Sequence, residues 1–523
     1  MRKFFFTAVF LVMVLFAVVG WAADWYCAAT GINGDGSEDS PWVGSSNIVW
    51  GAGGVQAGDT LWVLGTHVGE QLTIGSDNVI IRGDYPGNQG VIDANGNSTC
   101  IDNSDGHDGI TIQSIGITGF SEYGIRSYSA DNFVVKNCEF YNNVSGTSMK
   151  WVIGWDGNNC IIEGNYFHDL QSAQHVILFN HDGSGYCNTN DVDISYIRNN
   201  RFLRCDNTTS NGDGHVIALA GGTLYSRTIK HVVIENNNFD TCGNAEPNPI
   251  VSSYNAEDVI IQRNVFYNGS ARAIQVGTNC KDNYVAYNLV YNSIFYEDQP
   301  SLAGVLKLGN STGGCTECTT ATNIYFVNNT IYGIDAEDST HSRGAIVIAC
   351  ADDGELACDH IYVENNIVYA DMPSDTSGCW ELMVYDPGNR ITDLYSDYND
   401  WYRSQNTNNF IWFKGNAYSM SEFASYQSTE NQDTHSFTSN PLLTSTYHLS
   451  RNSPCIDAGT KLSIHDSDWQ DLAGNRQRYG TNPDIGCYER NTDFRAKWGG
   501  QHGWTSAPWG IGKWKKNRWT PYE

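Results

Sequence analysis

A short apolar run recurs through residues 114–403 of this chain. In residues 232–239, Val-Val-Ile-Glu-Asn-Asn-Asn-Phe, three apolar residues precede a polar stretch and a final aromatic residue. Close variants begin at Cys160, Val259, Ile324 and Ile361. Runs this short and this rich in β-branched residues predict strands, and the Asn and Gly residues between them predict turns.

Aligning the runs on the position two residues before the final apolar residue gives a column. Its members recur every 24 to 41 residues: Cys138, Asn165, Asn200, Asn237, Asn264, Asn288, Asn329, Asn366 and Asn399. Strands this short cannot bury their inner face alone, so a repeat of this length predicts coils that stack in parallel around one core. Asn tolerates the left-handed backbone of a sharp turn, and stacked amides can bond to each other along the stack. We therefore predict an all-β solenoid of about ten or more coils, in which the Asn column is structural.

The two ends of the chain differ from the repeat. Residues 1–22 have Arg2 and Lys3, an apolar run and then small residues, which predicts a secretory signal peptide, with a single membrane anchor as the alternative. The mature protein is then expected outside the cytoplasm, extracellular or periplasmic, with no membrane attachment. Residues 490–523 form a basic, Trp-rich tail that either packs back on the solenoid or binds sugars or the cell wall.

Charge and cysteine content narrow the expected partners. The chain has 30 Lys and Arg against 58 Asp and Glu, a formal charge of -28, so it repels nucleic acid and anionic membranes. Fifteen Cys in an exported chain predict disulfides. The expected pairs are Cys205–Cys242, Cys350–Cys358 and Cys455–Cys487. Cys315 and Cys318 form one CxxC with no second half, which argues against a zinc site.

Several segments carry a family resemblance. Residues 25–36, 56–64 and 79–83 resemble the N-terminal coils of secreted right-handed parallel β-helix proteins of the pectate-lyase-like superfamily. Residues 453–459 and 483–489 are similar to the closing motif of that group. The resemblance implies a right-handed parallel β-helix over residues 23–489 that includes a C-terminal closing unit. We expect a monomer that acts on a polysaccharide. This architecture carries several reactions, so the resemblance predicts the fold better than the chemistry.

Each coil has a second apolar strand, and its flanking residues also form columns. The strands are aligned on Ile125, Val152, Ile177, Ile217, Ile250, Ile274, Leu306 and Ile346. Two positions earlier stand Tyr123, Lys150, His175, His215, Asn248 and Arg272. Four positions later stand Ser129, Asp156, His181, Gly221, Tyr254, Thr278 and Asn310. Neighbouring coils lie roughly 4.8 Å apart, so side chains in one column can contact one bound polymer.

The earlier column gathers bases on an acidic protein. Lys150, His175, His215 and Arg272 are the predicted catalytic residues, because an anionic sugar chain needs cations to bind against a repelling background. The predicted substrate-binding residues are Asp156, His181, Tyr254 and Lys307. Taken singly, a His at the start of a strand is more often a hydrogen-bonded turn residue.

A uronate polymer would be cleaved by β-elimination. This reaction needs a group to neutralise the carboxylate, a base for the C5 proton and an acid for the leaving oxygen. The resemblance implies Lys or Arg as the base, often with Ca²⁺ at the carboxylate, which makes Lys150 or Arg272 the base and Ca²⁺ the expected cofactor. His175 and His215 then serve as base, acid or substrate ligand.

Two other functions stay open. An inverting glycoside hydrolase would use paired carboxylates, for which Asp156, Asp213, Asp182 and the Asp352-Asp353 pair are candidates. In a non-catalytic glycan-binding or adhesin-like protein, the residue columns would be surface features of the solenoid without a catalytic role. The sequence favours a secreted lyase on a uronate-containing polysaccharide.

Overall fold

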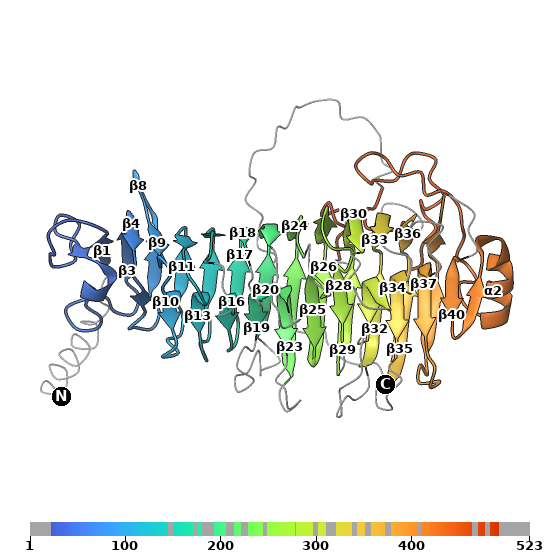
Figure 1. Ribbon diagram of the computed structural model, residues 1–523, viewed down its shortest axis with the longest axis horizontal. Coiled ribbons are helices and arrows are strands. Elements are labelled where there is room, and N and C mark those ends of the chain that lie inside the picture. Colours follow the sequence, from blue (N-terminus) through green and yellow to red (C-terminus); the bar gives the residue numbers. More distant parts are fainter. Residues whose placement is uncertain are drawn as a thin grey trace, which may run out of the picture.

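Three long parallel sheets wind around one core in the computed structural model (Figure 1). The structure describes residues 22–144, 150–171, 175–179, 193–205, 214–220, 228–243, 248–277, 279–295, 302–309, 321–336, 342–350, 357–371, 378–404, 409–462, 469–475 and 482–490. We call the three sheets A, B and C. Within the described residues, each coil contributes a strand to sheet A, then one to sheet C and then one to sheet B. The predicted right-handed parallel β-helix of at least ten coils is confirmed.

The strands of each sheet follow one another in coil order, except that β2 pairs with the outer edge of β1. Sheet A has 14 described strands, β2 (Trp42–Val43), β1 (Asp24–Ala28), β3 (Thr60–Leu64), β6 (Ile80–Arg82), β11 (Thr111–Gln113), β14 (Val134–Lys136), β17 (Ile161–Glu163), β20 (Ser195–Arg198), β23 (Ile229–Glu235), β26 (Ala256–Gln262), β29 (Lys281–Ala286), β32 (Ala321–Val327), β35 (Cys358–Glu364) and β38 (Leu394–Asp397).

Sheet B has 13 described strands, β5 (Leu72–Thr73), β10 (Thr99–Asn103), β13 (Tyr123–Ser127), β16 (Trp151–Trp155), β19 (His175–Phe179), β22 (His215–Ala220), β25 (Val251–Tyr254), β28 (Ile274–Val276), β31 (Ala303–Leu308), β34 (Arg343–Ala349), β37 (Cys379–Tyr385), β40 (Ile411–Phe413) and β41 (Asn416–Tyr418).

Sheet C has 12 described strands, β4 (Thr66–Val68), β9 (Val91–Asp93), β12 (Gly116–Thr118), β15 (Glu139–Tyr141), β18 (Tyr166–Leu170), β21 (Arg201–Cys205), β24 (Asn238–Asp240), β27 (Val265–Tyr267), β30 (Leu289–Phe295), β33 (Thr330–Ala336), β36 (Ile367–Tyr369) and β39 (Asp400–Trp401). A small hairpin, β7 (Asp84–Tyr85) with β8 (Asn88–Gln89), projects between β6 and β9 in Figure 1.

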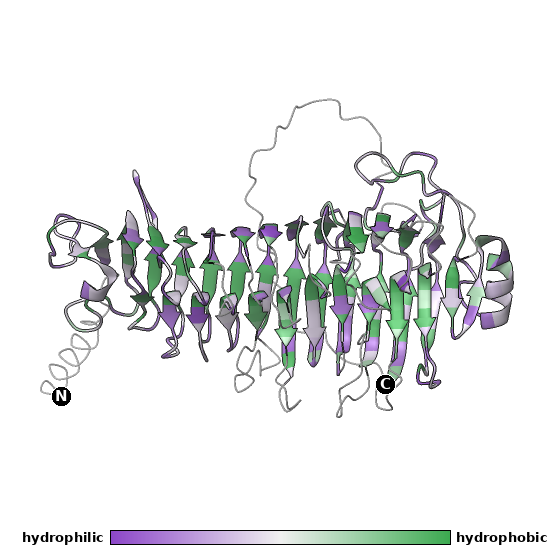
Figure 2. Cartoon of the chain, viewed as in Figure 1, coloured by the Kyte–Doolittle hydropathy of each residue, from purple (hydrophilic) through white to green (hydrophobic). Residues whose placement is uncertain are grey.

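The core consists of columns of identical or similar apolar side chains. In sheet C, neighbouring Phe rings stack with centroids 4.6 to 4.8 Å apart, in the column Phe140, Phe167, Phe202, Phe239 and Phe266. Figure 2 shows the strands mainly green and many of the turns purple, as the alternation in the sequence predicts. Stacking in register therefore buries each coil against its two neighbours.

The Asn column is confirmed as a structural element at the corner between sheets A and C. The backbone N–H and the Nδ2 of Asn237 both donate to Oδ1 of Asn264, at 3.0 Å each, and Nδ2 of Asn264 donates to the carbonyl of Ile234 at 2.9 Å. The same pattern repeats along the stack from Asn165 to Asn366. The amides therefore form a continuous hydrogen-bonded ladder inside the protein.

The left-handed backbone of this turn lies one residue earlier than the sequence suggested. The residue before each ladder Asn has a positive φ, for example 55° at Asn236, 54° at Arg263 and 56° at Tyr287. Arg and Tyr rarely adopt this conformation. We infer that the buried ladder holds the turn, because its hydrogen bonds fix the backbone whatever side chain precedes the Asn.

The C-terminal part closes the last coil and then returns along the stack. The helix α2 (Phe423–Glu430) follows the short 3-10 helix η2 (Met420–Glu422). It packs on the end of the β-helix that lies opposite the N-terminus (Figure 1). Asp433 then ends the ladder by accepting hydrogen bonds from Asn399 Nδ2 at 3.1 Å and Trp401 Nε1 at 2.9 Å. Further along, Thr460 and Gly486 hydrogen-bond to Asn365, so this segment covers the corner beside β35.

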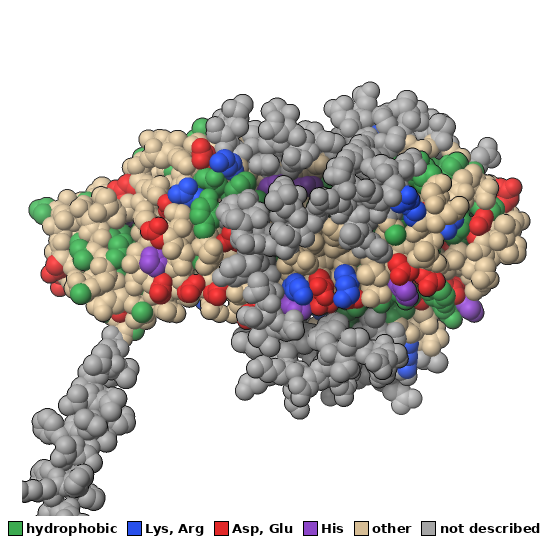
Figure 3. Space-filling view, turned by 90° about the horizontal axis from the view of Figure 1, so that it is seen from below, with side chains coloured by type: hydrophobic (Ala, Val, Ile, Leu, Met, Phe, Trp, Pro, Cys, Tyr) green, Lys and Arg blue, Asp and Glu red, His purple; other side chains and the backbone are tan. Residues whose placement is uncertain are grey.

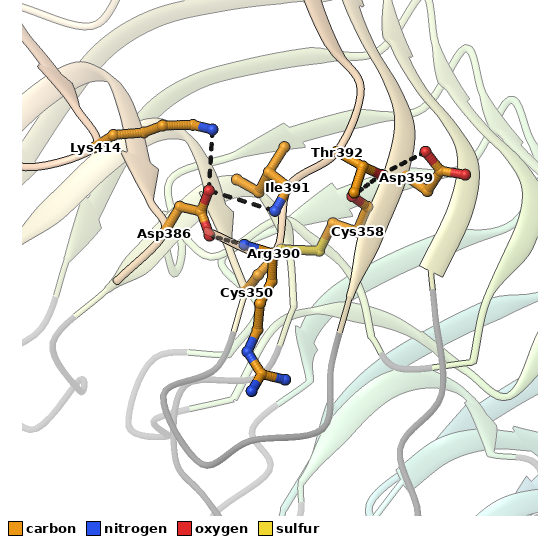
Figure 4. Close-up of a disulfide and its surroundings, with 8 residues drawn as sticks. All are labelled: Cys350, Cys358, Asp359, Asp386, Arg390, Ile391, Thr392 and Lys414. Carbon is orange, nitrogen blue, oxygen red and sulfur yellow. Dashed lines mark hydrogen bonds and ion pairs between the residues drawn. A yellow bond between two sulfur atoms is a disulfide. The ribbon is translucent and has the colours of Figure 1, made fainter. Parts of the chain in front are cut away.

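One of the three expected disulfides is confirmed. Cys350 and Cys358 join the ends of β34 and β35, beside Asp386, which pairs with Lys414 at 3.0 Å (Figure 4). The expected Cys205–Cys242 and Cys455–Cys487 disulfides are wrong, since all four residues are buried thiols.

Three of these thiols donate hydrogen bonds to backbone carbonyls or to a carboxylate. The thiol of Cys205 donates to the carbonyl of Phe167 at 3.6 Å, and that of Cys242 to the carbonyl of Asp240 at 3.5 Å. The thiol of Cys455 donates to Oδ2 of Asp400 at 3.1 Å. Cys205 and Cys242 thus occupy equivalent positions in adjacent coils but do not form a disulfide bond.

Several expectations fall on residues outside those described. These are the signal peptide, the basic tail and the Cys315–Cys318 pair, which all stay predictions. Among the described residues, no helix is both long and apolar enough to cross a membrane.

We expect Asn264→Ala to lower the free energy of unfolding by about 2–4 kcal/mol, because it leaves the two Asn237 donors and the Ile234 carbonyl buried without partners. Asn88→Ala, in the exposed hairpin, is the control and should change it little. Urea unfolding followed by circular dichroism measures both. Equal midpoints for the two variants would contradict a stabilising ladder.

Candidate functional site

The outer face of sheet B carries the predicted column, but the register differs from the sequence alignment. The observed partners in successive coils are Tyr123, Trp151, His175 and His215. Lys150 precedes this column by one residue, and Val251 rather than Ile250 pairs with Ile217. The alignment was therefore wrong by one residue in two coils.

The cause of the slip is visible in the burial pattern. Val152 and Ile153 are consecutive and both fully buried, and Ile250 and Val251 are almost fully buried. When two neighbouring residues are both interior, the apolar pattern does not say which of them faces the partner strand.

His175 and His215 lie face to face at the start of their strands. Their ring centroids are 5.5 Å apart and the planes differ by 3°. Nδ1–H of His215 donates to the Pro249 carbonyl at 2.9 Å, which leaves Nε2 as the acceptor. Burial lowers the pKa of His215 to about 4, helped by the charge of Arg272. Burial and His215 likewise hold the pKa of His175 well below its usual value, so both rings are neutral at pH 7.

Two further basic side chains lie buried on the same face. Arg272 is 2 % exposed and Lys307 is 1 % exposed. The Arg272 guanidinium donates to Oε1 of Gln275 at 2.9 Å, and Nε2 of Gln275 donates to the Gly309 carbonyl at 2.8 Å. Gln275 and Lys307 are register partners in β28 and β31, so the two cations lie in neighbouring coils.

These cations are poorly satisfied inside the protein. Nε of Arg272 and Nζ of Lys307 have no hydrogen-bond partner in the part of the chain that the structure describes. Burial, followed by the charge of Arg272, holds the pKa of Lys307 well below its usual value, and burial lowers the pKa of Arg272 to about 10. Unpaired buried donors cost free energy, and such sites are typical of ligand-binding positions.

The other predicted residues lie in different places. Tyr254, at the end of β25, lies beside this cluster, with its ring centroid 6.4 Å from that of His215. Asp156 is buried and accepts a hydrogen bond from the backbone N–H of Ser129. Lys150 is exposed and lies near Tyr123, its Nζ 5.5 Å from the ring centroid.

His181 lies outside the described residues. The structure thus brings together five of the eight predicted residues, at the site that we call the sheet B cluster: His175, His215, Tyr254, Arg272 and Lys307.

The expected Ca²⁺ does not fit the sheet B cluster. Ca²⁺ takes six to eight oxygen ligands. The described side chains of the cluster are two cations, two imidazoles and a phenol, which supply no carboxylate. Elsewhere, Asp359, His360 and Asp393 have ligand atoms within 4.8 Å of one another, but one of these is an imidazole nitrogen, which suits transition metals better.

The sequence analysis missed a pair of carboxylates on sheet A. Glu364 and Asp397 are register partners in β35 and β38, and both are buried. Burial, followed by the charge of Asp397, raises the pKa of Glu364 to about 7. Oδ2 of Asp397 lies 2.7 Å from Nδ1 of His435.

The signal for Glu364 was present but ambiguous. Glu163 and Glu235 occupy the same place in other coils, where they form ion pairs with Arg side chains. Asp156, the described hydrolase candidate of the sequence, is buried and accepts a hydrogen bond from the Ser129 backbone, and Asp182, Asp213 and Asp352-Asp353 lie outside the described residues.

A scan of protein-family models and a sequence search of curated proteins both find no match. Solved structures similar to the chain include a mannuronic acid specific polysaccharide family 6 lyase from human gut microbiota, at 14% identity and a TM-score of 0.46, covering 73% of this chain and 87% of that one.

The solved structure of pectate lyase Pel9A is also similar, at 13% identity and a TM-score of 0.40, covering 91% of this chain and 98% of that one. A GH136 lacto-N-biosidase from Eubacterium ramulus is similar at 13% identity and a TM-score of 0.37, covering 75% and 68%. All three similarities concern the fold.

We expect His215 to make the protein acid-sensitive. Its folded pKa of about 4 lies below the unfolded value near 6.5, so the unfolded chain binds the proton first. The contribution is complete above about pH 6.5 and is lost as the pH falls toward 4. Wild type should therefore lose roughly 2–3 kcal/mol more than His215→Gln over this range, measured by urea unfolding. His448→Gln, at an exposed position, is the control; equal losses in wild type and His215→Gln would refute the assignment.

Proposed function

We propose that this protein is a polysaccharide lyase that cleaves a uronate-containing glycan by β-elimination at the sheet B cluster. The observation that carries the proposal is the pair of buried, incompletely bonded cations, Arg272 and Lys307, in neighbouring coils of a chain with a formal charge of -28. An anionic sugar supplies the acceptors that these donors lack. The predicted signal peptide agrees with action on an extracellular or periplasmic polysaccharide.

Arg272 and Lys307 take different parts in this mechanism. Arg272 stays charged at neutral pH and neutralises the uronate carboxylate, which acidifies the neighbouring C5–H. Lys307 has a lowered pKa, so its neutral amine is available to take the C5 proton. The electron pair of the C–H bond forms the C4–C5 double bond, and the bond from C4 to the glycosidic oxygen breaks.

The leaving oxygen then needs a proton. The Tyr254 hydroxyl is the proposed acid, because its side chain lies within electrostatic reach of Arg272 and beside His215. The neutral His175 and His215 rings bind sugar hydroxyls. Since Arg272 neutralises the carboxylate, no step passes through Ca²⁺.

The base differs from the sequence expectation, which named Lys150 or Arg272. Lys150 is exposed, and its hydrogen bond with Tyr123 raises its pKa, so it stays protonated. Arg272 is buried but also remains protonated. Lys307 is the described Lys of the cluster that combines burial with a lowered pKa.

We expect Lys307→Arg to lower lyase turnover by about 10²–10⁴-fold, because a guanidinium keeps the charge but does not accept the proton. Ultraviolet absorbance of the unsaturated product, with pectic and alginate polymers as substrates, measures the rate. Wild-type activity should fall on acidification through the Lys307 pKa. Lys281→Gln, an exposed change on sheet A, is the control; wild-type turnover in Lys307→Arg would rule out this base.

A second candidate function is glycoside hydrolysis at Glu364 and Asp397. One carboxyl with a raised pKa beside a second carboxylate is the arrangement that glycosidases use for acid and base. Hydrolysis releases reducing ends without ultraviolet absorbance. In that case Glu364→Gln should abolish activity and Lys307→Arg should leave it unchanged, the opposite of the lyase result.

A further inference from the structure

We propose that Trp151, with Lys150 and Arg126 beside it, forms a remote binding site for an acidic sugar unit of a long polymer. We call these three residues the Trp151 platform. The proposal deepens the lyase function and rests on it for the identity of the polymer. It assigns the enzyme to long chains cut at an interior bond.

The indole of Trp151 covers Gly154 on the outer face of sheet B and packs against Tyr123 with ring centroids 5.4 Å apart. A Cβ added to Gly154 would stand 2.0 Å from Nε1 and 2.2 Å from Cδ1 of this ring. The ring therefore covers Gly154, which lies three residues after Trp151 in the same strand. Trp151 is half-buried. A flat aromatic ring of this kind suits the apolar C–H face of a sugar.

Tyr254 repeats this arrangement within the sheet B cluster. A Cβ on Gly277 would stand 2.0 Å from Cδ1 of Tyr254, so this ring also lies across a glycine. The two aromatic rings therefore lie on the same face of the same sheet, in β16 and β25. His175 and His215 occupy the two coils between them.

Two cations of the platform flank the indole of Trp151. Arg126 is the register partner of Gly154 in the preceding coil. Its guanidinium donates to Asp102 through hydrogen bonds of 3.0 and 2.7 Å, and 27 % of the Arg126 side chain is exposed. Lys150 is exposed and forms no ion pair with a described residue. A uronate ring on the indole would place its carboxylate between these charges.

Figure 3 shows one face of the molecule on which Lys or Arg, Asp or Glu, His and hydrophobic side chains lie near one another. The span sets the length of the ligand. Five coil steps of roughly 4.8 Å separate β16 from β31, so Trp151 and Lys307 lie about 24 Å apart along the stack. A short oligosaccharide held at Arg272 and Lys307 does not reach Trp151, which is the register partner of His175 at the other end of the cluster.

The test is binding of long and short polyuronates to wild type, Trp151→Ala and Gly154→Ala, by isothermal titration calorimetry. Gly154→Ala keeps the indole but pushes it off the sheet, and the Gly154 backbone is not in the left-handed region. Both variants should bind the long polymer about tenfold more weakly, with a smaller loss for short oligomers. Trp62→Ala is the matched control, because Trp62 is half-buried on sheet A beneath Arg82.

The outcomes separate this proposal from the lyase. Unchanged long-polymer affinity in both platform variants, with product formed by wild type, overturns the platform and leaves the lyase. Trp151-dependent binding without any unsaturated product supports the platform and overturns the lyase. A wild type that neither binds nor cleaves polyuronates overturns both. Thermal unfolding of each variant shows whether the fold is intact, and Gly154→Ala decides if Trp151→Ala does not fold.

Discussion

The whole structure depends on coils that stack in register, and the buried Asn ladder is the clearest expression of this constraint. Each ladder amide takes hydrogen bonds from the coil before it and gives them to the coil after it, so no coil can shift alone. The ladder is strong enough to hold Arg263 and Tyr287 in a left-handed conformation that these residues otherwise avoid. A stack fixed in this way repeats every side-chain position at one spacing.

That regular spacing is what turns scattered residues into a surface. His175, His215, Arg272 and Lys307 come from four coils and are separated by up to 132 positions in the chain (307 − 175). Parallel pairing in sheet B brings them to one outer face. This arrangement lowers the free energy of unfolding, because Arg272 and Lys307 are buried without full hydrogen bonding. Such a cost is typical of a site kept for its ligand.

Charge organises the same face at a larger scale. The chain is strongly acidic, yet the described outer face of sheet B gathers Arg126, Lys150, Arg272 and Lys307. These cations differ in environment. Arg126 is anchored by Asp102 near the surface, whereas Lys307 is buried next to another cation and loses its proton more easily. One face thus combines groups that bind anions with a group suited to accept a proton.

The sequence by itself determined the solenoid, the structural Asn column and the Cys350–Cys358 disulfide, because these follow from a repeat and from local spacing. It also named five residues of the sheet B cluster, since a polar side chain beside a buried strand is visible in the pattern. Only the tertiary structure decided the register. Val152 and Ile153 are both interior, so pairing with distant strands had to choose between Lys150 and Trp151 as the partner of His175. The same dependence on distant neighbours explains why Cys205 and Cys242 stay thiols and why the pKa of Lys307 is lowered, since burial and adjacent charge are properties of the stacked coils and not of any one segment.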